Sequence, residues 1–255
     1  MFGLFKRTPK QPKQYYWTVP GGEYDLLSAE VLTAPHTLIA GTTGCGKSTF
    51  LHSVMRALLV QHSPASAKLV LIDPKRVELR QYAYLPHTIG YAETPADALS
   101  ALESAHAMME QRYRRMVRQG LKTSNEADVY IIIDELADLM LSAEARHIKP
   151  VLQSLLQLGR ASRIHVIACT QCPNRKVIEA QLVCNFTNRF GLRCVSPIES
   201  RQIIGVKGCE SLPEHGQAWY VKGCHVGKYV LPFVTDADIR PLINYWMSDA
   251  AYRVA

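Results

Sequence analysis

The chain has 255 residues, of which 47% are hydrophobic and 20% are charged, and its formal net charge is +7. This composition fits one globular domain that buries its own core. No run approaches the ~20 apolar residues that span a bilayer, and nothing resembles a cleavable signal peptide. The seven cysteines are odd in number and scattered, which argues against a disulfide framework. We therefore expect a cytoplasmic protein with no direct membrane insertion.

The first 19 residues differ from those that follow. They carry four basic residues spaced by prolines, which predicts a basic flexible leader at 1–19 and one folded domain at 20–255. The positive net charge, to which the leader contributes, weakly favours a polyanionic partner. The basic residues of the leader are Lys6, Arg7, Lys10 and Lys13.

Strand and helix patterns alternate along the chain. Buried strands separated by helices predict an α/β fold with a mostly parallel central sheet covered by helices on both faces. The expected elements are strand 36–40, helix 47–60, strand 68–72, helix 96–118, strand 129–133, helix 148–162 and strand 164–169, then shorter strands at 189–195, 217–221 and 228–234 and a final helix at 236–249.

A glycine-rich loop follows the first strand and opens the first long helix. It has the pattern G-x-x-x-x-G-K-S of the phosphate-binding loop of P-loop NTPases, in the strand–loop–helix setting that this motif requires. We expect Lys47 to reach the β- and γ-phosphates of ATP and the Ser48 hydroxyl to ligate Mg²⁺. The predicted nucleotide-binding residues are Gly41, Thr42, Thr43, Gly44, Cys45, Gly46, Lys47, Ser48 and Thr49.

Two acidic residues end the apolar strand 129–133. This arrangement is the Walker B pattern, in which Asp134 holds Mg²⁺ and Glu135 orients and polarises the attacking water. Paired acids also begin ordinary loops, but a phosphate-binding loop ~90 residues upstream makes that reading improbable. The sequence therefore predicts a P-loop ATPase that uses Lys47 and Glu135 as catalytic residues.

Two further polar positions carry alternatives. Gln171 follows the strand 164–169, where it would either sense the γ-phosphate or cap the strand. Arg160 and Arg163 end the preceding helix, where arginines ordinarily cap the C-terminus. The functional alternative is an arginine inserted into the nucleotide site of a neighbouring subunit, because its guanidinium neutralises charge in the transition state.

Four segments together resemble the FtsK/SpoIIIE family of DNA translocases, and the resemblance covers roughly residues 20 to 235. They are residues 35–48, 72–79, 134–140 and 160–173, which match the family's PH-L-AG-TTG-x-GKS, IDPK-x-x-EL, DE-ADLM and RA-x-x-IH…TQ-x-P patterns. Smaller matches occur at 85–87, 199–201 and 208–212. This set is far more specific than a phosphate-binding loop alone.

The resemblance implies a RecA-like motor that forms a hexameric ring around double-stranded DNA, with ATP bound between subunits. At the matching positions it implies a trans-acting arginine at Arg160, a polar sensor at Gln171 and a basic pore-loop residue at Arg201. Both Arg160 and Gln171 would then be catalytic.

The chain departs from the family pattern near the expected DNA contacts. Cys172 stands where the family has an arginine, and Val183 and Pro197 replace lysines. Arg175 and Lys176 lie close to the lost arginine, and we expect them to contact DNA phosphates in its place.

The family's membrane-spanning region and sequence-reading module have no counterpart here. We therefore expect a reduced motor from a phage, plasmid or integrative element that relies on a loading partner protein. The alternative is the ATPase motor of a conjugative or protein-secretion machine, since secretion ATPases share the same core.

Overall fold

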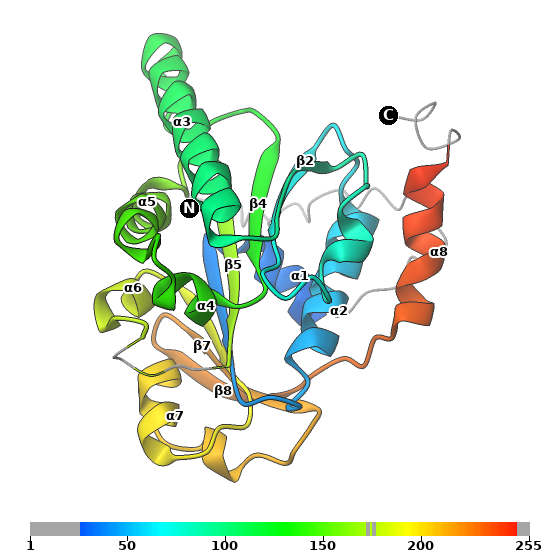
Figure 1. The fold of residues 1–255 in the computed structure, drawn as a ribbon, viewed down its shortest axis with the longest axis vertical. Coiled ribbons are helices and arrows are strands. Elements are labelled where there is room, and N and C mark those ends of the chain that lie inside the picture. The colour runs from blue at the N-terminus through cyan, green and yellow to red at the C-terminus, as the bar shows by residue number, and fades with distance from the viewer. Residues whose placement is uncertain (1–25, 172–173, 175–176, 249–255) are drawn as a thin grey trace, which may run out of the picture.

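The computed structural model describes residues 26–171, 174 and 177–248. The predicted leader at 1–19 lies outside the described residues, as do Arg175 and Lys176 and both ends of the predicted domain. Within the described part, the chain builds one eight-stranded sheet with helices on both faces (Figure 1). No helix in the described ranges is long and apolar enough to cross a membrane.

The elements follow one another in a mostly alternating order. The strands are β1 (His36–Ala40), β2 (Ala67–Ile72), β3 (Thr88–Ala92), β4 (Asp128–Ile133), β5 (Ile164–Thr170), β6 (Asn188–Gly191), β7 (Gln217–Lys222) and β8 (His225–Val230). The α-helices are α1 (Leu26–Thr33), α2 (Lys47–Gln61), α3 (Pro95–Gln119), α4 (Leu136–Leu141), α5 (Ala145–Leu158), α6 (Ala180–Cys184), α7 (Pro197–Ile204) and α8 (Asp236–Met247).

The sheet has the strand order β3-β2-β4-β5-β1-β6-β7-β8. The strands from β3 to β6 run parallel, and β7 and β8 extend the sheet as an antiparallel hairpin. The predicted mostly parallel α/β architecture is therefore confirmed. Because parallel strands end at the same edge, the loops after β1, β4 and β5 lie side by side, and this edge carries the predicted chemistry.

Each face of the sheet buries its own apolar core. Successive side chains of a strand alternate between faces, so Tyr130 and Ile132 pack with α1, α2 and α8 while Ile131 and Ile133 pack with α3, α4 and α5. Figure 1 shows these two helix groups on opposite sides of the sheet. Most residues of α2 are buried, which fixes the helix that begins at the phosphate-binding loop.

Several element boundaries differ from the expected ones. The helix expected at 148–162 begins at Ala145 and ends at Leu158, and residues 159–163 form a turn before β5 begins. The strand expected at 228–234 is displaced to His225–Val230, ending before Pro232, which lacks the N–H that a sheet ladder needs. The short elements α1, β3, α4, α6 and α7 were not among the expected ones.

Candidate nucleotide site

The phosphate-binding loop joins β1 to the start of α2. Gly44 and Gly46 have φ angles of 77° and 97°, a left-handed conformation that side chains disfavour, so the loop needs glycine at both positions. Gly46 is the N-cap of α2 and no side chain of the described residues caps it. The first N–H groups of α2 are therefore available to an anion, which the positive end of the helix also attracts.

Lys47 lies buried against its own loop. Its Nζ donates to the carbonyl oxygens of Gly41 and Thr42, each at 2.7 Å. Burial lowers the pKa of Lys47, and nearby acidic groups only partly oppose this. The ammonium group thus lacks a full counter-charge, which a phosphate group would supply by replacing the loop carbonyls.

The hydroxyl of Ser48 belongs to a chain of polar contacts. Its Oγ donates to Glu78 Oε1 at 2.7 Å, which leaves the oxygen's lone pairs for a cation. His52 Nε2 lies 3.3 Å from Glu78 Oε2, and His52 Nδ1 lies 2.8 Å from the Tyr82 hydroxyl. Hydrogen bonds from His52 and then Ser48 lower the pKa of Glu78 despite its partial burial. Glu78 was not predicted as a site residue, although the family pattern at 72–79 contains it.

Asp134 directly follows β4, near Glu78, and is 9% exposed. Burial, and then the negative charges of Asp73 and Glu78, raise its pKa to about 7. Asp73 is also buried, and its Oδ1 has no hydrogen-bond partner among the described residues. Mg²⁺ fits this site, because hard oxygen donors and unneutralised carboxylates are what this ion prefers.

Glu135 is held on two sides. Its carboxylate accepts the Gln171 backbone N–H, at 3.0 and 3.2 Å from its two oxygens, and it forms an ion pair of 3.1 Å with Lys75 Nζ. Burial by itself lowers the pKa of Lys75. The hydrogen bond to Glu135 and its negative charge raise that pKa by more, so the net shift is upward. Sequence reasoning missed Lys75, which stands in the family's IDPK pattern.

Gln171 connects Glu135 to the phosphate-binding loop. Its side-chain Oε1 accepts a hydrogen bond of 2.7 Å from the Thr43 hydroxyl, while its backbone contacts Glu135. The residue therefore lies between the predicted catalytic carboxylate and the predicted phosphates. A γ-phosphate sensor would need to lie at this place. A residue that only capped the strand would need neither the contact with Thr43 nor the contact with Glu135.

A pocket of about 540 Å³ extends from the loop and Asp134 toward an apolar wall. The wall includes Val77 and Phe233, which are 69% and 82% exposed. The ends of the β7–β8 hairpin meet here, since Leu231 N donates to Gly216 O at 2.9 Å. Sequence reasoning missed this wall, and no motif marks it. The residues contributed from this side are His215, Gly216, Leu231, Pro232 and Phe233.

Arg160 lies far from this pocket. It precedes β5, whereas Gln171 follows that strand, and the seven residues of β5 span about 23 Å. Its side chain is exposed and makes no hydrogen bond or ion pair to another described residue, which gives no support to a helix-capping role. The neighbouring Arg163 instead binds Asp128.

Arg201 is exposed on α7. The loop before α7 touches the phosphate-binding loop, because Thr42 N donates to Arg193 O at 2.9 Å. The structure thus brings together Lys47, Ser48, Asp134, Glu135 and Gln171, and it leaves Arg160 and Arg201 outside that cluster.

Fold and site together define a RecA-like P-loop ATPase. Residues 20–131 match the model of the FtsK/SpoIIIE family. The chain is 31% identical over 261 residues to the DNA translocase FtsK of Agrobacterium fabrum, covering 85% of this chain and 29% of that protein. It belongs to the FtsK/SpoIIIE family. The chain spans about a third or less of the length of the curated relatives that it matches first.

Solved structures show the same fold. The pCW3 conjugation coupling protein TcpA, in a monomer form with ATPgS, has a TM-score of 0.74 at 24% identity, covering 85% of this chain and 65% of that one. The cytoplasmic domain of the Type VII secretion ATPase EccC of Thermomonospora curvata has a TM-score of 0.68 at 21% identity. The match covers 83% of this chain and 28% of that one.

Proposed function

We propose that this chain is an ATP-driven motor for double-stranded DNA that works as a homo-oligomeric ring, expected to be a hexamer. Membership of the FtsK/SpoIIIE family and relatives that are named DNA translocases support this assignment. ATP and Mg²⁺ are the proposed cofactors. A cytoplasmic location and a loading partner stay predictions.

The phosphate end of the pocket supplies the hydrolytic chemistry. The loop amides and Lys47 would bind the phosphates, while Ser48 and Asp134 would hold Mg²⁺, which would neutralise phosphate charge. Glu135 orients a water for attack on the γ-phosphorus and accepts its proton, as the bond to the bridging oxygen breaks and ADP leaves. Gln171 is hydrogen-bonded to both Thr43 and Glu135. It would therefore couple the presence of the γ-phosphate to the position of the attacking water.

The apolar end of the pocket is proposed to hold the base. It begins beside Thr49, at the end of the loop where the α-phosphate and ribose of a bound nucleotide lie, and Phe233 offers an exposed aromatic face for stacking. The motifs bind only the phosphates, so this wall would contribute the affinity for the nucleoside.

The position of Arg160 carries the proposal of an oligomer. An exposed arginine at the edge of the sheet opposite its own phosphates cannot reach them across β5, but it can reach the site of an adjacent subunit. An arginine supplied in this way is worth about 10³–10⁵-fold in turnover. Arg160→Ala is therefore expected to bind ATP but to hydrolyse it slowly.

The proposed DNA contacts follow β5 and β6, whose ends lie at the same edge as the nucleotide site. Arg201 is exposed on α7 after β6, and Arg175 and Lys176 follow β5 outside the described residues. The hydrogen bond from Thr42 to Arg193 O joins the phosphate-binding loop to the segment that carries α7. Contacts of this kind bind phosphates without reading sequence.

ATP hydrolysis measured with and without duplex DNA, across a salt series, tests the proposal. We expect stimulation at low salt that declines steeply as salt rises, because phosphate contacts release counterions. The triple variant Arg175→Ala/Lys176→Ala/Arg201→Ala is expected to keep its basal rate and to lose the stimulation. Absence of stimulation by DNA at low salt would exclude the DNA motor and favour the motor of a protein-secretion machine.

A further inference from the structure

Arg160 stands on a turn whose other residues are held in place. The turn comprises residues 159–163, between α5 and β5. All five of its backbone carbonyl oxygens accept hydrogen bonds, from Ile164 N, Arg163 N, Ser124 N, Arg112 Nη1 and Val129 N in chain order. The exposed side chain of Arg160 is the exception, since it contacts no other described residue through a hydrogen bond or ion pair.

The first half of the turn is close-packed. A Cβ on Gly159 would lie 2.5 Å from the carbonyl oxygens of both Leu155 and Ile164, so only glycine fits there. The Ser162 hydroxyl donates to Gly159 O at 2.9 Å, which closes the turn on itself. Arg112, a buried residue of α3, donates to Ser162 O at 2.7 Å, and a charged donor makes this a strong hydrogen bond.

The second half is anchored through Arg163. Its φ of 59° is left-handed, a conformation that persists in a non-glycine residue only where surrounding contacts impose it. The guanidinium forms a two-pronged ion pair with Asp128 at the start of β4, with Nε at 2.9 Å from Oδ1. Two hydrogen bonds in parallel fix orientation as well as distance.

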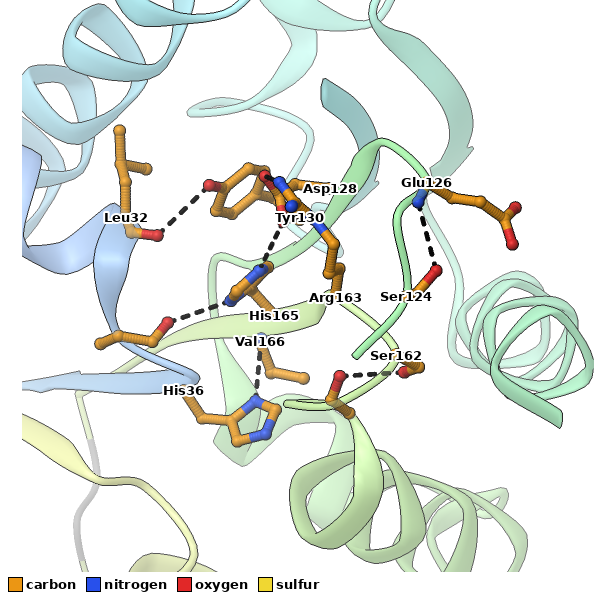
Figure 2. A network of polar contacts seen from close by, with 12 residues as sticks. Leu32, His36, Ser124, Glu126, Asp128, Tyr130, Ser162, Arg163, His165 and Val166 are labelled. Carbon is orange, nitrogen blue, oxygen red and sulfur yellow. Dashed lines mark hydrogen bonds and ion pairs between the residues drawn. The ribbon is translucent and has the colours of Figure 1, made fainter. Parts of the chain in front are cut away.

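Asp128 is itself fixed by its neighbours. His165 Nε2 lies 3.1 Å from Asp128 Oδ1, its Nδ1 lies 3.0 Å from Ala34 O, and its ring stacks on Tyr130. Figure 2 shows Arg163, from the turn, and His165, from β5, converging on Asp128, while the Tyr130 hydroxyl donates to Leu32 O. Burial raises the pKa of Asp128, but the hydrogen bonds and charges of His165 and Arg163 outweigh it, so the carboxylate stays ionised.

We propose that this network is a rigid mount for Arg160, in which Asp128, Arg163 and Arg112 are positioning residues that act on the catalytic site of the adjacent subunit. The inference rests on the proposed intersubunit role of Arg160. A long, flexible side chain that must meet a phosphate across an interface needs a fixed backbone, because a displacement of about 1 Å costs about 100-fold in rate. None of the three residues touches the nucleotide pocket of its own chain.

The test is complementation between subunits. Arg163→Gly removes the anchor at a backbone conformation that glycine adopts freely, so the variant is expected to fold. Alone, it should hydrolyse ATP about 10- to 100-fold more slowly than the wild type. Its affinity for a fluorescent ATP analogue should be unchanged. Mixed with Lys47→Ala, which has a defective site but an intact mount, it should regain activity, because its intact nucleotide site receives the neighbour's Arg160.

Arg76→Gly is the matched control. Arg76 is the other left-handed arginine in the described ranges and pairs with Glu93, so the chemical change is the same at a different place. Any activity that this variant loses should not return on mixing with Lys47→Ala. The inference is overturned if Arg163→Gly is as active as the wild type. It is also overturned if the variant is slow and mixing with Lys47→Ala does not restore activity. Arg160→Ala as active as the wild type overturns the proposed intersubunit site itself.

Discussion

Replacing Asp134 by asparagine should change how the stability of the nucleotide-free protein depends on pH. The raised pKa means that folded Asp134 keeps its proton up to about pH 7, whereas an unfolded aspartate loses it near 3.8. The folded state therefore binds more protons in this window, and stability falls as pH rises through it. At about 1.4 kcal/mol for each pH unit, the loss approaches about 4 kcal/mol above pH 7. Asp134→Asn removes that loss.

Urea unfolding in EDTA, without nucleotide, at intervals from pH 4 to pH 8 measures this effect. We expect the free energy of unfolding of Asp134→Asn to exceed that of the wild type increasingly with pH. Glu103→Gln neutralises an exposed carboxylate on α3 and should run parallel to the wild type. Parallel curves for Asp134→Asn and the wild type would show that Asp134 is ionised in the free site and refute the reasoning.

Three further substitutions examine the pocket. Lys75→Met removes the ion pair of Glu135 and should lower kcat about 100-fold in a steady-state assay while ATP still binds, since a correctly placed base is worth about 10²–10⁴-fold. An unchanged kcat would mean that the backbone N–H groups of Ala137 and Gln171 position Glu135 without Lys75. Glu78→Gln weakens the acceptor of the Ser48 hydroxyl and should raise the Mg²⁺ concentration for half-maximal nucleotide binding about tenfold. A Mg²⁺ titration that matches the wild type would contradict this role. Phe233→Ala should weaken ATP by about 1 kcal/mol or more in calorimetry while tripolyphosphate binds as before; equal losses for both ligands would indicate a collapsed pocket instead.

The first part of the site was predictable from the sequence because its residues are close together. β1 spans His36–Ala40 and α2 begins at Lys47, as expected, since the short loop 41–46 between the strand and the helix forms its structure from contacts among its own residues. Asp134 and Glu135 follow their strand directly. Local patterns of this kind report local structure.

The missing part depends on contacts between distant residues. Lys75 meets Glu135 across 60 positions, and the apolar wall needs Gly216 beside Leu231, which only the pairing of the β7–β8 hairpin brings about. The predicted end of the helix at residue 162 was wrong for a related reason. Residues 160–162 continue a helical pattern, but in the fold the chain leaves the helix through a turn that ends at the left-handed Arg163 and is bonded to the distant Ser124.

The arrangement of the sheet has a consequence for synthesis on the ribosome. β1 is made before the other strands of this sheet, yet it lies between β5 and β6, which begin at Ile164 and Asn188. The phosphate-binding loop therefore emerges well over a hundred residues before the strands that hold it, and the wall at Phe233 follows later still. At about 5–20 residues per second, the nascent chain passes many seconds with every phosphate-binding residue present and no assembled pocket. Nucleotide can thus stabilise only a chain that has been synthesised past Phe233.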